Sequence, residues 1–323
     1  MSVATPYDRK RIRDLSDREL FDCLEQRLGH DPARSGWTPG LVELHRHSLE
    51  RRLVLMPEYW ATPLYAPNGL PAAVWAGTYS AGVAYDAAKQ IAFLDSVNRF
   101  REELDVFPRK PAQAEEDLRQ FYWSNTEFSH GDAVLYYSLL RHLRPRQVIE
   151  VGGGYSTLLA ASAAEKNETT EIICVEPFPR PFLEKPLPHV ALRKALAQDV
   201  PPSFFDSLSD GDLLFIDSSH ISKTGSDVNH LFLRVLPQLP RGVWVHIHDI
   251  FLPYEYPKHW VEQLLYWNEQ YLLAALLANS SKYEVVAGNY FLSRAGVADF
   301  QRYGLPDKGA LPGGTSFWMR AVA

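Results

Sequence analysis

The most restrictive feature of this sequence is an alternation, between residues 130 and 248, of short apolar runs with segments of helical periodicity. The expected strands are 147–151, 171–175, 190–195, 212–217 and 242–248, and the expected helices are 130–143, 156–165 and 227–236. Strands joined through helices need right-handed crossovers, which make the strands parallel and place helices on both faces of the sheet. The pattern predicts a doubly wound, mainly parallel α/β sheet.

The C-terminal part of the chain breaks this alternation. Two β-rich runs, 283–292 and 315–321, follow each other without a convincing helix between them. Such runs favour an antiparallel pair. We therefore expect an antiparallel strand at the edge of the sheet.

The N-terminal third has a different character. Residues 7–28 have the periodicity of an amphipathic helix, and residues 87–104 return to helical spacing. Between them, residues 60–85 carry no charge and are interrupted by proline and glycine. This apolar segment would either pack against another domain or subunit, as in a homo-oligomer, or form a substrate lid. Proline-rich residues 107–112 mark the expected boundary between a helical and loop-rich accessory region, 1–112, and a catalytic domain, 113–323.

Charge and cysteine content narrow the functional classes. The net charge is -6, from 33 basic and 39 acidic residues, so no basic field favours nucleic acid. The two cysteines, Cys23 and Cys174, provide neither a disulfide framework nor a CxxC metal knuckle. No apolar stretch reaches the roughly 18 to 20 residues that span a bilayer. We expect a cytoplasmic protein that binds neither membrane nor nucleic acid.

Ligands of parallel sheets bind beyond the carboxyl ends of the strands, so the residues that end each run are informative. The first run enters a glycine turn, Val148-Ile-Glu-Val-Gly-Gly-Gly-Tyr-Ser-Thr157, where glycine lets a ligand approach the backbone. The second ends at Glu176, whose carboxylate could accept hydrogen bonds from two ribose hydroxyls. The third ends at Gln198-Asp199, and the fourth, fully apolar, ends at Asp217. A dinucleotide GxGxxG motif would need glycine or alanine at Thr157, which disfavours NAD.

These ordered strand ends resemble the class I, Rossmann-like methyltransferases that use S-adenosylmethionine (SAM). The resemblance covers about 200 residues. Three strings, 216–220, 225–229 and 246–253, are similar to a bacterial subgroup with small-molecule substrates. The resemblance implies that SAM is the cofactor, that S-adenosylhomocysteine (SAH) is the product, and that Asp199 contacts the adenine. The implied cofactor residues are Glu150, Gly152, Gly153, Gly154, Ser156, Thr157, Glu176, Asp199, Asp217 and Ser218.

Methyl transfer needs an aligned acceptor and, for a hydroxyl or ammonium, a base. Candidate bases cluster after the fourth and fifth runs, at His220, His248 and Asp249, with His248 first among them. His246 shares a strand face with His248 but lies deeper, and we expect a hydrogen-bonded core histidine there. Aromatic residues at 121–123, 253–260 and 266–271 suit the walls of an acceptor pocket.

Metal assistance is the alternative chemistry. Related O-methyltransferases often hold a divalent cation with carboxylates at places matching Asp217 and Asp249, and His220 and His248 could add nitrogen ligands. Because Ile250 stands where a third oxygen ligand would follow Asp249, a metal is not favoured.

The sequence thus predicts an O- or N-methyltransferase for a small metabolite, possibly of a secondary pathway. Two alternatives stay open: a SAM-binding scaffold without turnover and, less favoured, an NAD-dependent oxidoreductase.

Overall fold

The computed structural model describes residues 70–111, 113–128, 130–295 and 313–323, with a few scattered positions between 16 and 48. Contacts divide the chain into two compact units, Met1–Pro71 and Ala72–Ala323. The expected helix at 7–28 lies almost wholly outside the described residues. The expected boundary at residue 112 falls within the second unit, and as a division between accessory and catalytic functions it stays a prediction.

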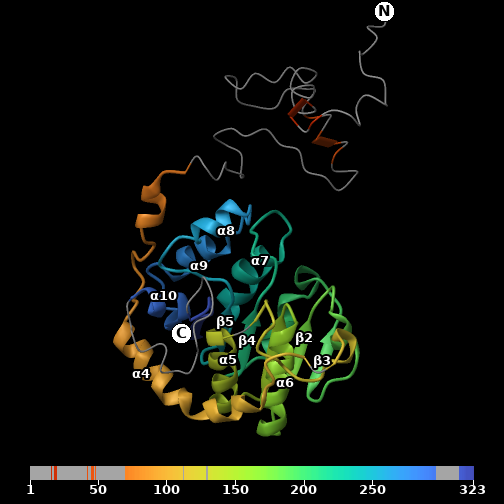
Figure 1. The fold of residues 1–323 in the computed structure, drawn as a ribbon. Coiled ribbons are helices and arrows are strands. Elements are labelled where there is room, and N and C mark those ends of the chain that lie inside the picture. Colours follow the sequence, from red (N-terminus) through yellow and green to blue (C-terminus); the bar gives the residue numbers. More distant parts are fainter. Residues whose placement is uncertain are drawn as a thin grey trace, which may run out of the picture. The chain divides into compact units, whose positions relative to one another are not determined.

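A seven-stranded sheet forms the centre of the second unit (Figure 1). Its strands are β1 (Gln147–Val151), β2 (Glu171–Val175), β3 (Val190–Arg193), β4 (Leu213–Ile216), β5 (Trp244–Ile247), β6 (Tyr283–Gly288) and β7 (Phe317–Ala321). The order is β3-β2-β1-β4-β5-β7-β6, in which β1 to β5 are parallel and β7 is antiparallel to both neighbours. The predicted doubly wound sheet is confirmed.

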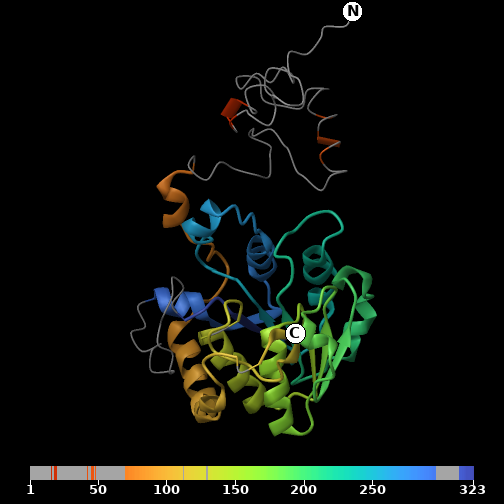
Figure 2. The same cartoon turned by 45° about the vertical axis from the view of Figure 1, so that its right-hand side comes forward.

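Helices cover both faces of this sheet because its strands are apolar on both sides. One core contains α4 (Ala87–Val97), α5 (His130–Leu143) and α6 (Tyr155–Asn167), and Figure 2 shows α4 and α5 side by side. The other contains α7 (Asp227–His230), the π-helical turn Leu231–Val235 and α9 (Glu269–Leu277). The short helix α8 (Lys258–Glu262) lies between β5 and α9 in the chain.

The C-terminal region differs from the expectation in one detail. The predicted strand 283–292 ends at Gly288, and Asn289–Arg294 form α10. The Asn289 side chain donates a hydrogen bond to the Asp132 carboxylate at 2.9 Å, which holds the start of this helix against α5. The predicted antiparallel pair at the edge of the sheet is confirmed, with β6 outermost and β7 between β5 and β6.

The segment before α4 is loop-rich from residue 70, as expected, with one short 3-10 helix at Ala72–Ala76. It contacts the loop after β5: the Trp75 indole donates to the Tyr256 carbonyl, and the Tyr79 amide donates to the Pro253 carbonyl. Within the described residues, no helix is long and apolar enough to cross a membrane.

Candidate active site

The glycine turn connects β1 to α6. A Cβ atom on Gly152, whose φ is +86°, would lie 1.6 Å from the Asp217 carbonyl oxygen, and one on Gly153 would lie 2.1 Å from the Cys174 sulfur. Both glycines are therefore required by close packing within the protein. A Cβ on Gly154 would meet nothing within 4 Å, so the open side of the turn is at this residue.

At the start of α6, a backbone amide is hydrogen-bonded to a side chain of the same helix. The Gly154 amide donates a hydrogen bond to the Thr157 hydroxyl at 3.0 Å, and both Ser156 and Thr157 are buried. A side chain that caps the first turn of a helix accepts one of its free amide protons. The roles of Ser156 and Thr157 as cofactor contacts stay predictions, and the Thr157 hydroxyl already has a partner in the protein.

Glu176 links the end of β2 to this turn. Its Oε2 accepts a hydrogen bond from the Gly153 amide at 3.2 Å, and its Oε1 accepts one from the Phe178 amide at 2.7 Å. The Phe178 ring is 81% exposed at the same strand end. The carboxylate predicted for the ribose is thus fixed beside the glycine turn, next to an exposed aromatic ring that sequence reasoning passed over.

Two polar residues, Gln198 and Asp199, follow the end of β3. Asp199 is exposed in the 3-10 helix Ala197–Asp199, and its adenine contact stays a prediction. Its neighbour Gln198 has a buried Oε1 with no hydrogen-bond partner in the part of the chain that the structure describes. A buried acceptor without a partner is costly unless a ligand or water satisfies it.

Glu150 is fully buried on β1 below the turn. Burial raises the pKa of its carboxyl to about 7, although the hydroxyls of Ser156 and Thr157 act in the opposite direction.

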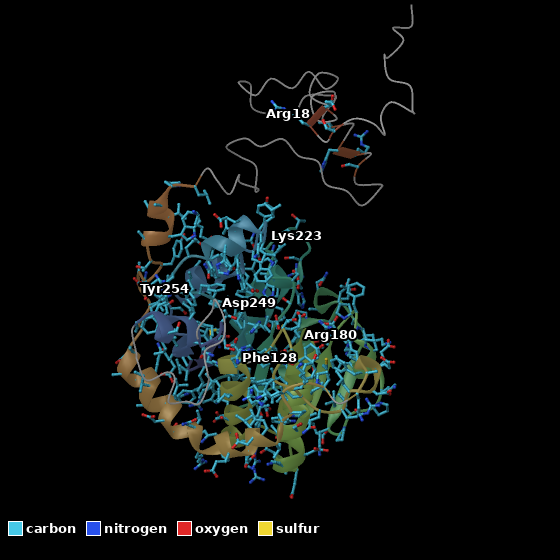
Figure 3. The ribbon with its side chains drawn as sticks, in the orientation of Figure 1. Arg18, Phe128, Arg180, Lys223, Asp249 and Tyr254 are labelled. Carbon is cyan, nitrogen blue, oxygen red and sulfur yellow. The ribbon has the colours of Figure 1, made fainter. Side chains whose placement is uncertain are left out.

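His248 follows β5 and lies among three carboxylates. Its Nδ1 is 3.5 Å from Asp217 Oδ2 and 3.5 Å from Asp249 Oδ2, and its Nε2 is 3.4 Å from Asp132 Oδ2. Burial alone would lower the pKa of this imidazole, but Asp249, Asp217 and Asp132 outweigh burial and hold the pKa well above its ordinary value. Figure 3 labels Asp249 near the middle of the second unit. The Phe128 ring lies 5.2 Å from that of His248.

His220 approaches the same carboxylates from the end of β4. Its Nε2 is 3.4 Å from Asp217 Oδ1 and 3.7 Å from Asp249 Oδ2, while its Nδ1 is hydrogen-bonded to Glu269. Burial opposes the charged ring, but Glu269, Asp217 and Asp249 raise its pKa well above the usual range. The pKa of Asp217 is lowered, because the two histidines outweigh its burial.

Two residues of the cluster have a strained backbone conformation. His220 and Asp249 have φ values of 60° and 58°, in the left-handed region that residues other than glycine rarely adopt. Asp249 is fixed further by the Thr315 hydroxyl, which donates to its Oδ1 at 2.7 Å. Strained residues of this kind cluster at functional sites, where the surrounding structure enforces them.

Residues of the strings 216–220 and 225–229 form hydrogen bonds that hold the backbone around His220. Ser219 donates through its amide and hydroxyl to Asp227, and Ser226 caps α7 by accepting from the Asn229 amide. The carbonyl of His220 accepts from the Asn268 amide at 3.0 Å. The strings 216–220 and 225–229 are thus joined to each other by hydrogen bonds.

His246 is the core histidine that was expected. It is fully buried, and its Nε2 is hydrogen-bonded to the Ser316 hydroxyl at 2.8 Å. Burial lowers its pKa well below the ordinary value.

The aromatic residues expected around the acceptor pocket differ in where they lie. Phe121 and Phe128 are buried in the core beside α5. By contrast, the half-buried Trp267 ring lies 4.2 Å from that of His220, and it contacts Trp260, which contacts Phe251. These three rings form a continuous wall, which we call the aromatic wall, leading away from His220.

Two carboxylates of the cluster, Asp132 and Glu269, were not found by sequence reasoning. Both lie in the first turn of a helix, α5 and α9 respectively, where an acidic residue is favoured by the helix dipole alone.

Among the residues that the structure describes, one group of ligand atoms is compact enough for a metal ion. Atoms of Asp217, His248 and Asp249 all lie within 4.8 Å of one another. The set mixes nitrogen with oxygen, which suits a transition metal better than magnesium. Ile250 is buried and offers no further oxygen.

Strand order 3-2-1-4-5-7-6 with one antiparallel strand, a glycine turn after β1 and an acid after β2 define a class I methyltransferase fold. Residues 149–250 match the family model described as a methyltransferase domain. Residues 149–250 of this chain therefore match a methyltransferase domain, within a sheet that has the class I strand order.

Individual relatives are distant. An uncharacterized protein of Archaeoglobus fulgidus is 29% identical over 135 residues, which are 40% of this chain and 59% of that protein. Among solved structures, the O-methyltransferase TomG from Streptomyces achromogenes, involved in tomaymycin synthesis and determined with SAM, is 16% identical, with a TM-score of 0.39 over 75% of this chain and 92% of TomG. An O-methyltransferase from Bacillus cereus determined with SAH is 16% identical, with a TM-score of 0.34 over 75% and 93%. With TM-scores this low, the fold is assigned from the strand order itself.

Proposed function

We propose that this protein transfers the methyl group of SAM to a hydroxyl or amino group of a small metabolite, in a secondary pathway. The observation that carries the proposal is the convergence of a glycine turn, a ribose-type carboxylate and a histidine–carboxylate cluster at the same edge of the sheet. The family match to residues 149–250 supports it.

The cofactor would bind along the ends of β1, β2, β3 and β4. Glu176 would accept hydrogen bonds from the ribose hydroxyls, and the exposed Phe178 ring would pack on the adenine. The open side of Gly154 leaves room for the backbone to approach the ligand. Gln198 joins Asp199 as a candidate for the adenine amino group, because its buried oxygen needs a donor.

SAM supplies an activated methyl group when bound. A lone pair of the acceptor forms the new bond to carbon, the carbon–sulfur pair stays on sulfur to give SAH, and the acceptor proton must leave. His248, His220 and Asp249 are the groups placed to receive that proton. His248 stays the leading candidate because its Nδ1 has no hydrogen-bond partner among the described residues, whereas His220 Nδ1 is hydrogen-bonded to Glu269.

The acceptor would lie against the aromatic wall beside His220. Flat aromatic surfaces and a few charged groups suit a moderately sized organic molecule. Net charge argues for a small-molecule acceptor and against nucleic acid.

A divalent cation is the second candidate arrangement, favoured by the compact set Asp217, His248 and Asp249. A cation there would orient an acceptor oxygen and ease loss of its proton. The histidine mechanism stays preferred, because the buried Ile250 offers no further oxygen ligand beside Asp249.

Calorimetry with SAH tests the cofactor assignment, and no binding at millimolar SAH would contradict it. A scaffold role is distinguished by His248→Ala and His220→Ala. For an enzyme, these variants should lose turnover and keep SAH binding. If wild type binds SAH but methylates none of a broad panel of hydroxyl and amine acceptors, the scaffold role gains support. Titration with NADH, followed by its fluorescence, tests the oxidoreductase alternative.

A further inference from the structure

We propose that Asp132 is a positioning residue for His248: it holds the imidazole so that Nε2 carries a proton and Nδ1 faces Asp217 and Asp249. This proposal rests on the proposed methyl transfer, in which His248 receives the acceptor proton.

Asp132 is held by many donors. Its Oδ1 accepts hydrogen bonds from the Thr315 amide at 3.0 Å, the Ser316 amide at 2.7 Å and the Asn289 side chain at 2.9 Å. The residue is only 5% exposed; burial raises the pKa of its carboxyl, but the His248 ring, together with Thr315 and Ser316, outweighs burial and keeps that pKa below its ordinary value.

The chain wraps tightly around this carboxylate. A Cβ on Gly314, whose φ is +90°, would lie 2.3 Å from Asp132 Oδ1, and one on Gly131 would lie 1.9 Å from the Gly313 carbonyl oxygen. Segment 313–316 therefore fits against the start of α5 only with glycine at both places. The backbone of these two segments therefore fixes the position of the Asp132 carboxylate, and a change of side-chain rotamer cannot move it away.

The remaining oxygen faces His248. Asp132 Oδ2 accepts from the Thr315 amide at 3.0 Å and lies 3.4 Å from His248 Nε2. A carboxylate only accepts hydrogen bonds, and Nε2 is the ring nitrogen that makes one with a carboxylate among the described residues, so Asp132 favours a neutral ring protonated on Nε2. Its lone pair is then on Nδ1, which is buried and has no hydrogen-bond partner among the described residues. That atom points to the carboxylates of Asp217 and Asp249.

A purely structural role is the competing explanation, since Asp132 also ties β7 and α10 to α5. Asp132→Asn separates the two roles. The amide oxygen can keep the three donors on Oδ1, whereas its NH2 group would donate to His248 Nε2. The neutral ring would then carry its proton on Nδ1, and the accepting atom would face the wrong way.

For Asp132→Asn we expect kcat to fall by about 10²- to 10⁴-fold, the usual contribution of general acid–base catalysis. The KM for the acceptor and the Kd for SAH should stay within about twofold. The matched control is Glu171→Gln, which changes the carboxylate of another pair, Glu171 with His189 at 3.2 Å, on the exposed surface. This control should leave all three constants unchanged.

A second measurement does not depend on turnover. Nitrogen-15 spectra of labelled histidines, recorded up to the pH at which the ring is neutral, show which nitrogen of His248 is protonated. The His248→Gln variant assigns the signal. We expect the proton on Nε2 in the wild type and on Nδ1 in Asp132→Asn.

The outcomes separate the two proposals. If no acceptor is methylated but the proton moves from Nε2 to Nδ1, the proposed function fails and the positioning by Asp132 stands. A wild-type ring that carries its proton on Nδ1 overturns the positioning role, even if Asp132→Asn does not fold. Unchanged kcat in a folded Asp132→Asn variant overturns it as well.

Discussion

The Gly153 amide donates a hydrogen bond to Glu176 Oε2 at 3.2 Å, so that the end of β2 is tied to the turn that ends β1. The second oxygen of Glu176 accepts from the Phe178 amide at 2.7 Å. A carboxylate has about four acceptor positions, and these two bonds leave further lone pairs for a ligand. Glu176 can therefore shape the turn and bind a ribose at the same time.

Replacing Glu176 with alanine should weaken SAH binding by about 1 to 3 kcal/mol, the usual loss for hydrogen bonds to a charged group. Calorimetry measures the change. Glu171→Ala is the matched control, since Glu171 begins the same strand at its opposite end and should bind SAH normally. Equal affinities of Glu176→Ala and the wild type would remove Glu176 from the cofactor site.

The pH dependence of turnover should reflect the raised pKa values of His248 and His220. A protonated imidazole cannot accept a proton, so activity requires the neutral ring. Because nearby carboxylates hold both pKa values well above 6.5, the ascending limb of kcat/KM should lie above pH 6.5. An ascending limb below pH 6.5 would show that another group receives the proton.

Much of the sheet could be predicted because its strands are short apolar runs bounded by turn residues. The bounds of β1 and β2 agree with the expected ranges at both ends. Helix α10 was missed, because Phe291 and Leu292 extend the apolar character of β6 past Gly288. What makes Asn289–Arg294 helical is tertiary contact, including the bond from Asn289 to Asp132, which lies 157 positions away.

The site could be predicted only in part. Asp217, His248 and Asp249 were found because neighbouring parallel strands end at the same edge of a sheet. Asp132 and Glu269 lie 116 and 49 positions from the histidines they contact, and each looks locally like an ordinary first-turn acid. No sequence pattern at either position distinguishes a helix cap from a partner of histidine.

Glu150 should make the fold less stable as the pH rises from about 4.5 to about 7. Its pKa is about 7 in the folded protein and about 4.5 in an unfolded chain, so between these values the unfolded state binds fewer protons. The free energy of unfolding then falls as pH rises, by about 3 kcal/mol in total. Glu150→Gln should remove this loss and raise the Tm at pH 8, with little effect near pH 5.

Thermal unfolding of Glu150→Gln at both pH values measures this effect. The exposed residue Glu165 on α6 provides the control, since Glu165→Gln should leave the pH dependence of the Tm unchanged. If Glu150→Gln and the wild type lose stability equally between pH 5 and pH 8, Glu150 is charged without cost in the folded protein.

The last prediction separates histidine chemistry from metal chemistry. We expect a chelator such as EDTA to leave turnover intact, because Ile250 offers no oxygen beside Asp249. Asp249→Ala should then lower kcat, since Asp249 Oδ2 lies 3.5 Å from His248 Nδ1, and leave SAH affinity unchanged. A bound cation predicts the opposite response to chelation: the chelator abolishes activity and manganese or zinc restores it, while Asp249→Ala again impairs acceptor use far more than cofactor binding. Activity restored by metal after chelation would assign Asp217, His248 and Asp249 as ligands in place of a metal-free base.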